Sequence, residues 1–456
     1  MHDSPERYDL IIIGTGSGNS IPEFLDDWKI AVVERDVFGG TCINRGCVPS
    51  KMFVIPADVA YEARHSARLG LDVKVGNADW GAIRDRVFGR IDQISVDGRE
   101  YRAHGSPNIS LIEATARFVG PKLLDVEGRT ITADHILIAA GTRPTIPPIA
   151  GLVETGFHTS DSIMRLEQLP ERLAIIGGGF IAAEMGHVFE AYGTKVSIFT
   201  RSETMLRMED VEISQRFTDL FSKRVDLHPC QLPNRIERRP TGIVVHLHDR
   251  ELEVDELLVA TGREPNSDLL DAEVGGVDLH HRGTIRVDEH MLTSAEGVWA
   301  IGDIANDFHL KHVANEEARV AFWNIAHPED LRSIDYRAVP AAVFSSPQVA
   351  SVGLTEQAAT RLGRRFAVGR RDYSGTAYGW ALVDETSFAK VLVDPETRLI
   401  LGAHIIGPHA AILIQSVVQA MQFGQTADAV ANGQYWIHPA MGEVVENALL
   451  EALARI

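Results

Sequence analysis

Residues 8–19 read YDLIIIGTGSGN, in which the apolar run Leu10–Ile13 leads into a turn rich in glycine. An uninterrupted apolar run predicts a strand buried on both faces, as in a parallel sheet covered by helices. Gly14 permits a tight turn, and Gly16 lets the backbone approach a pyrophosphate at the start of a helix. Asn19 replaces the third glycine of the usual fingerprint, and we expect Gly18 beside it to relieve crowding. The stretch therefore predicts a dinucleotide-binding fold.

A second apolar run, Ile30–Val33, ends in Glu34. A carboxylate about 20 residues after the first glycine is placed to accept hydrogen bonds from ribose hydroxyls. A glycine fingerprint alone is a weak signal, and a tight turn that binds no phosphate is the alternative. Strand, glycine turn, helix, strand and acid in this order together favour a bound nucleotide.

The same pattern occurs a second time in the chain. Leu173–Ile176 is an apolar run, and it is followed by the turn GGGFIA, which starts at Gly177 and includes Gly179. Ala182 occupies the third position of the fingerprint, where alanine is tolerated. Lys195–Phe199 is the next predicted strand. A repeat of one strand–turn–helix unit is an internal duplication. It predicts two bound dinucleotides.

The second unit lacks the acid expected after its second strand. Arg201 and Arg207 follow that strand instead. Arginine at this place suits a ribose 2′-phosphate, which favours NADPH over NADH. The alternative is that both arginines are solvated surface charges.

Residues 39–51 read GGTCINRGCVPSK and hold two of the three cysteines, Cys42 and Cys47. Two cysteines at this spacing can close a small disulfide ring. The Gly-Gly pair before them lets the backbone pack tightly against a ligand. We therefore predict a redox-active dithiol beside a bound flavin; the alternative is two reduced cysteines near a helix start. The third cysteine, Cys230, belongs to no motif.

Composition limits the kinds of partner. The chain has 456 residues, with 44 Lys and Arg against 63 Asp and Glu, a formal charge of −19. This balance disfavours nucleic acid and anionic membrane as partners. Three cysteines do not make a disulfide framework, so a reducing compartment is expected. Because no apolar run reaches membrane length, we predict a cytoplasmic protein.

The last part of the chain differs in character. His438 with Glu443 is a candidate general base with its orienting acid, although such a pair is more often structural. We predict a helix over residues 410–423. Apolar positions predict strands of an antiparallel sheet at Val343, Val349, Val352, Val391, Leu392 and Ile405.

These motifs occur in the order typical of one family. The cysteine stretch, both glycine turns, ATGREPN at residues 260–266, GVWAIGD at 297–303 and HPAMGE at 438–443 resemble the pyridine nucleotide-disulfide oxidoreductases. The resemblance covers essentially the whole chain. It implies an α/β fold with two Rossmann-like dinucleotide-binding domains and a C-terminal α+β dimerisation domain. The implied domains are 1–147 for FAD, 148–265 for NADPH, 266–335 returning to the FAD and central part, and 336–456 for dimerisation.

The resemblance also implies a role for each member of the redox centre. Cys42 corresponds to the thiol that attacks substrate, and Cys47 to the thiol next to the flavin. Because the attacking thiol must be a thiolate, the pKa of Cys42 is expected to be lowered by a helix N-terminus or by protonated His438. Lys51 corresponds to a lysine near flavin N5, paired with Glu184.

Other roles concern the coenzyme pocket and the partner subunit. Phe180 stands at the gate over the nicotinamide, and Asp303 would bind the ribityl chain of FAD. His438, oriented by Glu443, would be the general acid–base of the partner subunit's active site. The implied FAD-binding residues are Gly14, Gly16, Gly18, Glu34, Gly40, Thr41, Lys51, Ala140, Gly141, Asp303, Val313 and Ala314. Those implied for NADPH are Gly177, Gly179, Phe180, Ile181, Glu184, Arg201, Arg207 and Gly262, and no metal is expected.

The implied activity is reduction of a small-molecule disulfide by NADPH through FAD and the dithiol, in a homodimer with shared active sites. Four stretches resemble a subgroup whose substrate thiol carries an uncharged disaccharide: GTGSGNS at 14–20, RVFGRID at 86–92, TAYGWA at 376–381 and GQYWIHPA at 433–440. A dihydrolipoamide dehydrogenase is one alternative, although it would prefer NAD and an acid in place of Thr200. A flavoprotein that only senses or binds nucleotides is another, but it would need neither the dithiol nor His438.

Overall fold

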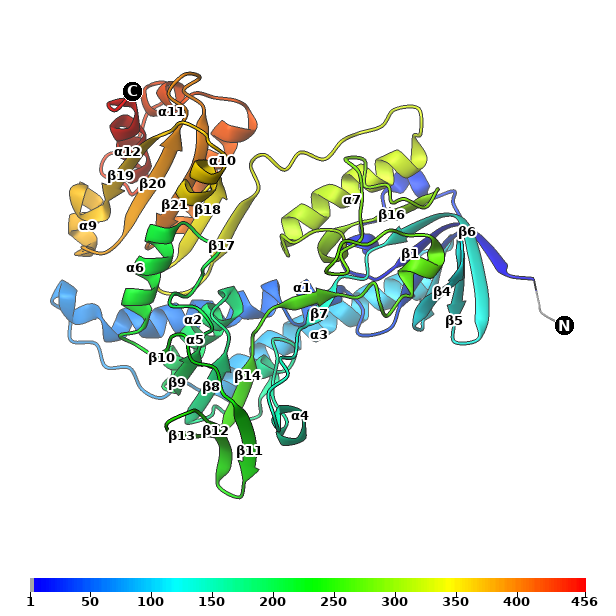
Figure 1. Cartoon of the computed structure of the whole chain (residues 1–456), viewed down its shortest axis with the longest axis horizontal. Coiled ribbons are helices and arrows are strands. Elements are labelled where there is room, and N and C mark those ends of the chain that lie inside the picture. Colours follow the sequence, from blue (N-terminus) through cyan, green and yellow to red (C-terminus); the bar gives the residue numbers. More distant parts are fainter. Residues whose placement is uncertain (1–3) are drawn as a thin grey trace. The chain divides into compact units, whose positions relative to one another are not determined.

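The computed structural model describes residues 4–456 and divides into two compact units (Figure 1). The first contains the chain up to Pro49, Ala82–Thr145 and Gly262–Asp335. The second contains Ser50–Gly81, Ile146–Thr261 and Tyr336–Ile456. Domain boundaries at residues 147, 265 and 335 stay a prediction.

A seven-stranded sheet forms the centre of the first unit. Its order is β3-β2-β1-β6-β5-β4, and β16 pairs with the last part of β6. The pairs among β3, β2, β1, β6 and β16 are parallel, whereas β4, β5 and β6 form an antiparallel meander. The strands are β1 Glu6–Ile13, β2 Ile30–Glu34, β3 Ile109–Glu113, β4 Ala116–Gly120, β5 Leu123–Val126, β6 Arg129–Ile138 and β16 Val298–Ala300.

Side chains of β1 are buried on both faces of this sheet. Leu10 and Ile12 belong to a core that includes Phe322 of helix α7 (Lys311–Ala326). Ile11 and Ile13 belong to a second core on the other face. Because alternate side chains of a strand point to opposite faces, a continuous apolar run is needed to fill both cores. This confirms the predicted buried strand.

The helix expected after the first glycine turn is not an α-helix. Only two short 3₁₀ segments, Ser17–Asn19 and Glu23–Leu25, lie between β1 and β2. Pro22 stands between them, and a proline disfavours helical geometry in the residue before it. The pyrophosphate turn of this unit therefore opens onto a 3₁₀ segment, which corrects the sequence prediction.

Besides the sheet and α7, the first unit contains short elements and parts of two long helices. Glu127 and Gly128 both have positive φ and form the two-residue turn of the β5–β6 hairpin. The other elements are α1 Gly40–Asn44, α2 Cys47–Arg64 and α3 Trp80–His104, the last two crossing the unit boundary, together with β7 Thr142–Pro144 and β15 Arg263–Pro265.

The second unit contains a four-stranded parallel sheet of order β10-β9-β8-β14. An α-helix, α5 (Phe180–Tyr192), follows the glycine turn after β8, as a dinucleotide-binding unit requires. A small antiparallel sheet, β11-β12-β13, packs its Ile236 and Val245 in the same core as Ile176 of β8. The elements are β8 Arg172–Ile176, β9 Lys195–Phe199, β10 Asp226–His228, β11 Arg235–Arg239, β12 Gly242–His246, β13 Glu251–Val254, β14 Glu256–Val259, α4 Leu152–Thr155 and α6 Val211–Phe221.

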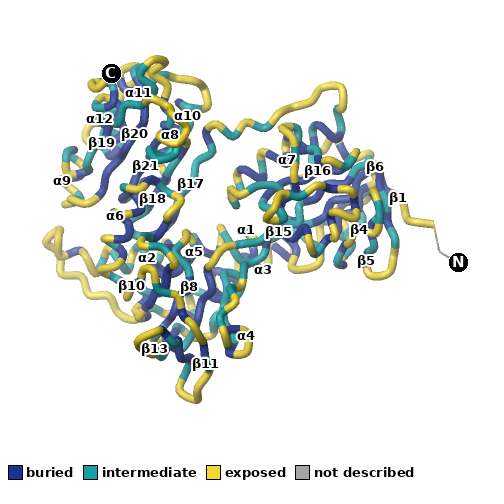
Figure 2. Tube along the Cα trace, in the orientation of Figure 1, coloured by how far each residue is buried: buried dark blue, intermediate teal, exposed yellow. Residues whose placement is uncertain are grey.

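The end of the chain forms a five-stranded antiparallel sheet of order β17-β18-β21-β20-β19. The sheet and the helices α10, α11 and α12 share one apolar core, and Figure 2 shows β20 and β21 as largely buried. The strands are β17 Pro340–Val343, β18 Val349–Gly353, β19 Ala367–Asp372, β20 Phe388–Val393 and β21 Ile400–Ile406. The helices are α8 Glu356–Arg361, α9 Ala377–Leu382, α10 Ala410–Gln422, α11 Ala427–Asn432 and α12 Glu443–Leu453.

This sheet confirms the predicted antiparallel strands, and α10 confirms the predicted helix. Strand β19 was not predicted. Within residues 4–456, no helix combines the length and apolar composition that crossing a membrane would need.

Candidate active site

Two helices hold the cysteine pair. Cys42 lies within α1, and Cys47 is the first residue of the 18-residue helix α2. The two sulfurs are not joined by a disulfide, and their thiols share a hydrogen bond. Cys42 is half-buried and Cys47 is exposed. The structure therefore places both cysteines together in their reduced form, with Cys47 at the positive end of a long helix.

The hydrogen bond with Cys47 raises the pKa of the Cys42 thiol, and burial raises it further. The positive charge of Lys311 acts in the opposite direction. The lowered pKa expected for the attacking thiol is therefore not found at Cys42 within one chain. Two thiols this close cannot both ionise easily, because the second negative charge would be repelled by the first.

Lys311 was not singled out by the sequence. It is the first residue of α7, and its Nζ donates a hydrogen bond of 2.8 Å to Ser17 Oγ in the first glycine turn. Burial lowers the pKa of Lys311, while the cysteines and Asp303 favour its charged form. A lysine at a helix start carries no sequence signal of its own, so only the fold reveals this cation.

The first glycine turn is shaped by close backbone contacts. A Cβ at Gly14 would lie 2.5 Å from the carbonyl oxygen of Ala139, and one at Gly18 would lie 2.8 Å from Ala139 Cβ. A Cβ at Gly40 would lie 2.6 Å from Gly16 Cα, whereas the space beside Gly16 itself is open. These contacts leave an uncovered backbone surface at the end of β1, which fits a dinucleotide such as FAD.

Glu34 lies where the sequence placed it, at the end of β2. Its Oε2 accepts hydrogen bonds from Thr15 Oγ1 at 2.6 Å and from the Thr15 backbone amide at 2.9 Å. Thr15 Oγ1 in turn accepts from the amide of Gly39, the first residue of the cysteine stretch. The carboxylate thus stands at the glycine turn and ties it to the cysteine segment. Asn19 accepts a hydrogen bond of 2.8 Å from Arg102 of α3, a contact that glycine could not make.

Three other predicted FAD residues, Ala140, Gly141 and Asp303, follow the carboxyl ends of β6 and β16. Asp303 Oδ2 accepts a hydrogen bond of 3.3 Å from Thr142 Oγ1. Ala140 and Gly141 are joined to Asn266, whose Nδ2 donates to the Ala140 carbonyl at 2.7 Å. Val313 and Ala314 are buried in the first turn of α7, and Thr41 is exposed beside Cys42.

Glu317 is a buried acid that the sequence analysis missed. Its Oε2 accepts from the amide of Gly302 at 2.6 Å, and its Oε1 accepts from Asn306 Nδ2 at 2.8 Å. The signal available in the sequence was an acid among the apolar residues of this helix. In the structure Glu317 is completely buried, and carboxylates are seldom buried without partners.

The second unit contains the predicted pair of Lys51 and Glu184. Lys51 lies one turn after Cys47 on α2, and its Nζ is 2.8 Å from both carboxylate oxygens of Glu184. Glu184 is buried on α5, and its Oε1 also accepts from the amide of Phe344 at 3.0 Å. The structure therefore brings these two residues together as an ion pair.

The second glycine turn resembles the first in its contacts. A Cβ at Gly177 would lie 2.1 Å from the carbonyl oxygen of Ala260, and the space beside Gly179 is open. Helix α5 starts at Phe180, which is exposed, with Ile181 next to it. Gly262 has a positive φ of 123°. An open turn at the N-terminus of a true α-helix fits a second dinucleotide.

Arg201 and Arg207 are both exposed and follow β9. Among the described residues, neither guanidinium has a hydrogen bond or ion pair. Arginines without partners beside a nucleotide turn are available for an anionic ligand.

His438 and Glu443 also form the predicted pair. His438 Nδ1 is 2.7 Å from Glu443 Oε1, and the imidazole is largely exposed. Glu443 is the first residue of α12; its Oε2 is buried and has no hydrogen-bond partner among the described residues. The pair belongs to the second compact unit, whereas Cys42 and Cys47 belong to the first.

The chain matches the pyridine nucleotide-disulphide oxidoreductase family over residues 8–319. Residues 339–449 match the dimerisation domain of the same family. The chain therefore belongs to this family of oxidoreductases, as the motifs predicted.

Individual members of the family differ in how similar they are to this chain. The chain is 46% identical to the mycothione reductase of Mycobacterium tuberculosis (strain ATCC 25618 / H37Rv) over 458 residues, which cover 98% of this chain and 99% of that protein. It is 33% identical to the mercuric reductase of Staphylococcus aureus, over 92% of this chain and 78% of that one. It is 30% identical to the dihydrolipoyl dehydrogenase of Haloferax volcanii, over 98% and 97%.

A solved structure shows the same fold. The HOCl-induced flavoprotein disulfide reductase RclA from Escherichia coli superposes with a TM-score of 0.86 at 28% identity, covering 97% of this chain and 99% of that one. The predicted fold of two nucleotide-binding units and a dimerisation domain is confirmed.

Proposed function

We propose that this protein reduces mycothione to mycothiol with NADPH, through bound FAD and the Cys42–Cys47 pair. The observation that carries the proposal is the pair of hydrogen-bonded thiols beside a glycine turn, in a chain similar over its full length to a mycothione reductase. Lys51 with Glu184 and His438 with Glu443 supply the charged groups that such a dithiol needs nearby.

The residues at the two glycine turns fit the two cofactors. Gly14, Gly16 and Glu34 would hold FAD, while Gly177 and Gly179 would hold the pyrophosphate of NADPH. Arg201 and Arg207 would bind the 2′-phosphate. When bound, the cofactors supply the two electrons that reduce the disulfide form of the cysteine pair to the dithiol.

Thiol chemistry then completes the reaction. The Cys42 thiolate attacks one sulfur of the substrate disulfide, forming a mixed disulfide and releasing one thiolate, which takes a proton from His438. The Cys47 thiolate attacks the Cys42 sulfur, restores the Cys42–Cys47 disulfide and releases the second substrate thiolate. The dithiol loses two electrons and the substrate disulfide gains them.

In this proposal, His438 acts on the dithiol of the partner subunit. Its exposed imidazole suits that role, because Nδ1 is used by Glu443 and Nε2 is left for substrate. A protonated imidazole beside Cys42 would also favour the thiolate, which one chain alone does not.

A substrate panel tests the proposal. NADPH oxidation by purified holoenzyme is followed with mycothione, glutathione disulfide, lipoamide and Hg(II), and the kcat/KM values are compared. Mycothione should exceed the others by about 10²-fold or more, because polar groups that bind the sugars stay unpaired with other substrates. Comparable turnover of lipoamide, or a preference for Hg(II), would contradict the proposed substrate.

A further inference from the structure

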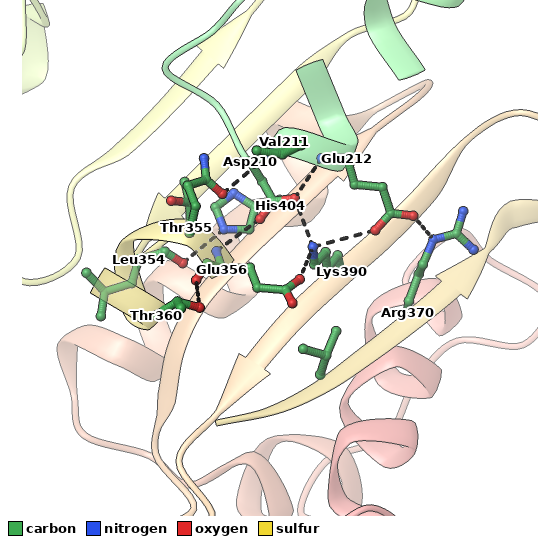
Figure 3. A network of polar contacts seen from close by, with 12 residues as sticks. Asp210, Val211, Glu212, Leu354, Thr355, Glu356, Thr360, Arg370, Lys390 and His404 are labelled. Atoms are coloured by element: carbon green, nitrogen blue, oxygen red, sulfur yellow. Dashed lines mark hydrogen bonds and ion pairs between the residues drawn. The ribbon is translucent and has the colours of Figure 1, made fainter. Parts of the chain in front are cut away.

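Lys390 is a charged residue in the interior of the C-terminal sheet. Its side chain is only 4% exposed, and its Nζ lies 2.9 Å from Asp210 Oδ1, 2.6 Å from Glu356 Oε2 and 3.5 Å from Glu212 Oε2 (Figure 3). Burial alone opposes ionisation of both partners. However, mutual hydrogen bonding lowers the pKa of Asp210 and raises that of Lys390, so the ion pair persists near neutral pH.

The sheet provides a polar row for this cluster. His404 of β21 stands opposite Lys390 of β20, which in turn stands opposite Arg370 of β19. Arg370 Nε reaches Glu212 Oε1 at 2.5 Å, and His404 Nε2 is 3.0 Å from the Leu354 carbonyl oxygen. Figure 3 shows these side chains directed toward the start of α6. Burial lowers the pKa of His404 and Arg370 is partly exposed, so Lys390 is the buried charge of this row. Burying a charge is costly, and Lys390 with its acids therefore calls for a specific reason.

One acid of the cluster, Asp210, ends the segment that carries the coenzyme arginines, whereas Glu212 lies in α6 and Glu356 in α8. Asp210 caps α6, accepting from the amide of Glu212 at 3.1 Å, and its second oxygen accepts from the amide of Glu356 at 3.0 Å. Arg207 is only three residues before Asp210. Gln357 Nε2 donates to the Glu209 carbonyl at 2.9 Å, which adds a second attachment between α8 and this segment.

The segment is also attached to the second glycine turn. The amide of Leu206, which has a left-handed φ of 52°, donates to the Gly178 carbonyl at 2.7 Å. The Leu206 carbonyl accepts from Ser214 Oγ of α6 at 2.7 Å. Arg207 therefore stands between two fixed points, the turn at Gly178 and the cluster at Asp210.

We propose that Asp210 and Lys390 are positioning residues for coenzyme selectivity: the cluster fixes the 200–210 segment so that Arg201 and Arg207 meet the 2′-phosphate. This inference rests on the proposed use of NADPH. The two guanidiniums have no hydrogen bond or ion pair among the described residues, so no side-chain contact orients them. Their position therefore depends on the backbone of the segment that carries them. A shift of about 1 Å is enough to weaken a charged contact of this kind.

The choice between NADPH and NADH distinguishes this positioning role from a purely structural one, because a structural defect would affect both coenzymes. We would measure kcat and KM for NADPH and for NADH with Lys390→Met and Asp210→Asn, the latter keeping an oxygen that can cap α6. The KM for NADPH should rise several-fold in each, with kcat at saturating NADPH and the KM for NADH nearly unchanged. Lys390→Arg should retain most of the selectivity, because the positive charge remains.

A matched control removes another ion pair from the same nucleotide-binding part. Asp255 accepts from Arg172 Nη2 at 2.6 Å, at the start of β8, away from the glycine turn that follows this strand. Asp255→Asn should leave the ratio of the two KM values unchanged. If Lys390→Met and Asp210→Asn also leave this KM ratio unchanged, or raise the KM for both coenzymes equally, the cluster does not determine selectivity and the inference is wrong.

The double variant Arg201→Ala with Arg207→Ala separates this inference from the proposed function. If it leaves the ratio of the KM for NADPH to the KM for NADH unchanged, the proposed binding of the 2′-phosphate by these arginines is wrong, and the inference fails with it. If it raises this ratio while the cluster variants do not, only the inference fails. Adding Lys390→Met to the double variant should raise the ratio no further, because both changes act on one contact.

Discussion

Lys311 is a cation that interacts with both thiols of the redox pair and with Asp303. Its hydrogen bond to Ser17 Oγ fixes the ammonium beside the first glycine turn, on the same compact unit as the cysteines. The charge opposes the rise in the pKa of Cys42 that the Cys47 hydrogen bond and burial cause. Its effect should therefore appear in the ionisation of the dithiol.

Lys311→Met should raise the pH at which the reduced dithiol ionises. Losing a nearby positive charge disfavours the thiolate, so the half-point of Cys42 alkylation should move upward by roughly one pH unit. The measurement is the rate of iodoacetamide labelling against pH in a Cys230→Ser background, with the modified residue identified by mass. Lys311→Arg keeps the charge and should stay close to the parent; an unchanged half-point in Lys311→Met would contradict the role.

Sequence motifs predicted the candidate redox residues and the pair of Lys51 with Glu184, but not the cations Lys311 and Lys390. Cys42, Cys47 and the pair of His438 with Glu443 lie in local stretches whose spacing is distinctive. Lys311 and Lys390 lie in no such stretch, because each meets its partners through residues distant in the chain. Ion clusters built from separate elements leave no periodic pattern in the sequence.

At the scale of elements, Gly40 joins the start of α1 to the first glycine turn. A Cβ there would lie 2.6 Å from Gly16 Cα, a backbone atom that cannot move aside without displacing the turn. Gly40→Ala should therefore lower the FAD content several-fold, measured as flavin absorbance per protein after purification. Gly70→Ala has a similar left-handed φ, but its Cβ would meet nothing within 4 Å. It should retain its FAD, and equal losses in both variants would show that backbone strain alone is responsible.

The strands were predicted well and the first helix was not. The runs Leu10–Ile13 of β1 and Leu173–Ile176 of β8 are apolar because both faces of each strand are buried there, and this pattern is visible in the sequence. The glycine fingerprint predicted a helix after the first turn. The region between Asn19 and Ile30 contains Pro22, and the structure has only 3₁₀ segments there. Strand β19 was missed because its sequence, AVGRRD, has charged side chains that are satisfied by partners in the fold.

At the scale of the whole molecule, the dimerisation domain carries large apolar side chains in solvent. Tyr435 is fully exposed and Ile437 is 78% exposed, in the same segment as His438. Exposed apolar side chains gathered in one segment mark an interaction surface. We propose that a second copy of the chain covers them, as the match to a dimerisation domain suggests. In the shared sites proposed above, each His438 would act on the dithiol of the partner.

Hybrid dimers test whether the active sites are shared. Cys42→Ser and His438→Ala should each be nearly inactive alone, because each removes one required group from both sites of its homodimer. In a hybrid of the two, one site receives both defects and the other receives neither, so activity should return to about half that of the wild-type dimer. The measurement is mycothione reduction by dual-tagged hybrids purified after co-expression. If His438 served the dithiol of its own chain, every site would keep one defect, and the hybrid would be no more active than the separate variants.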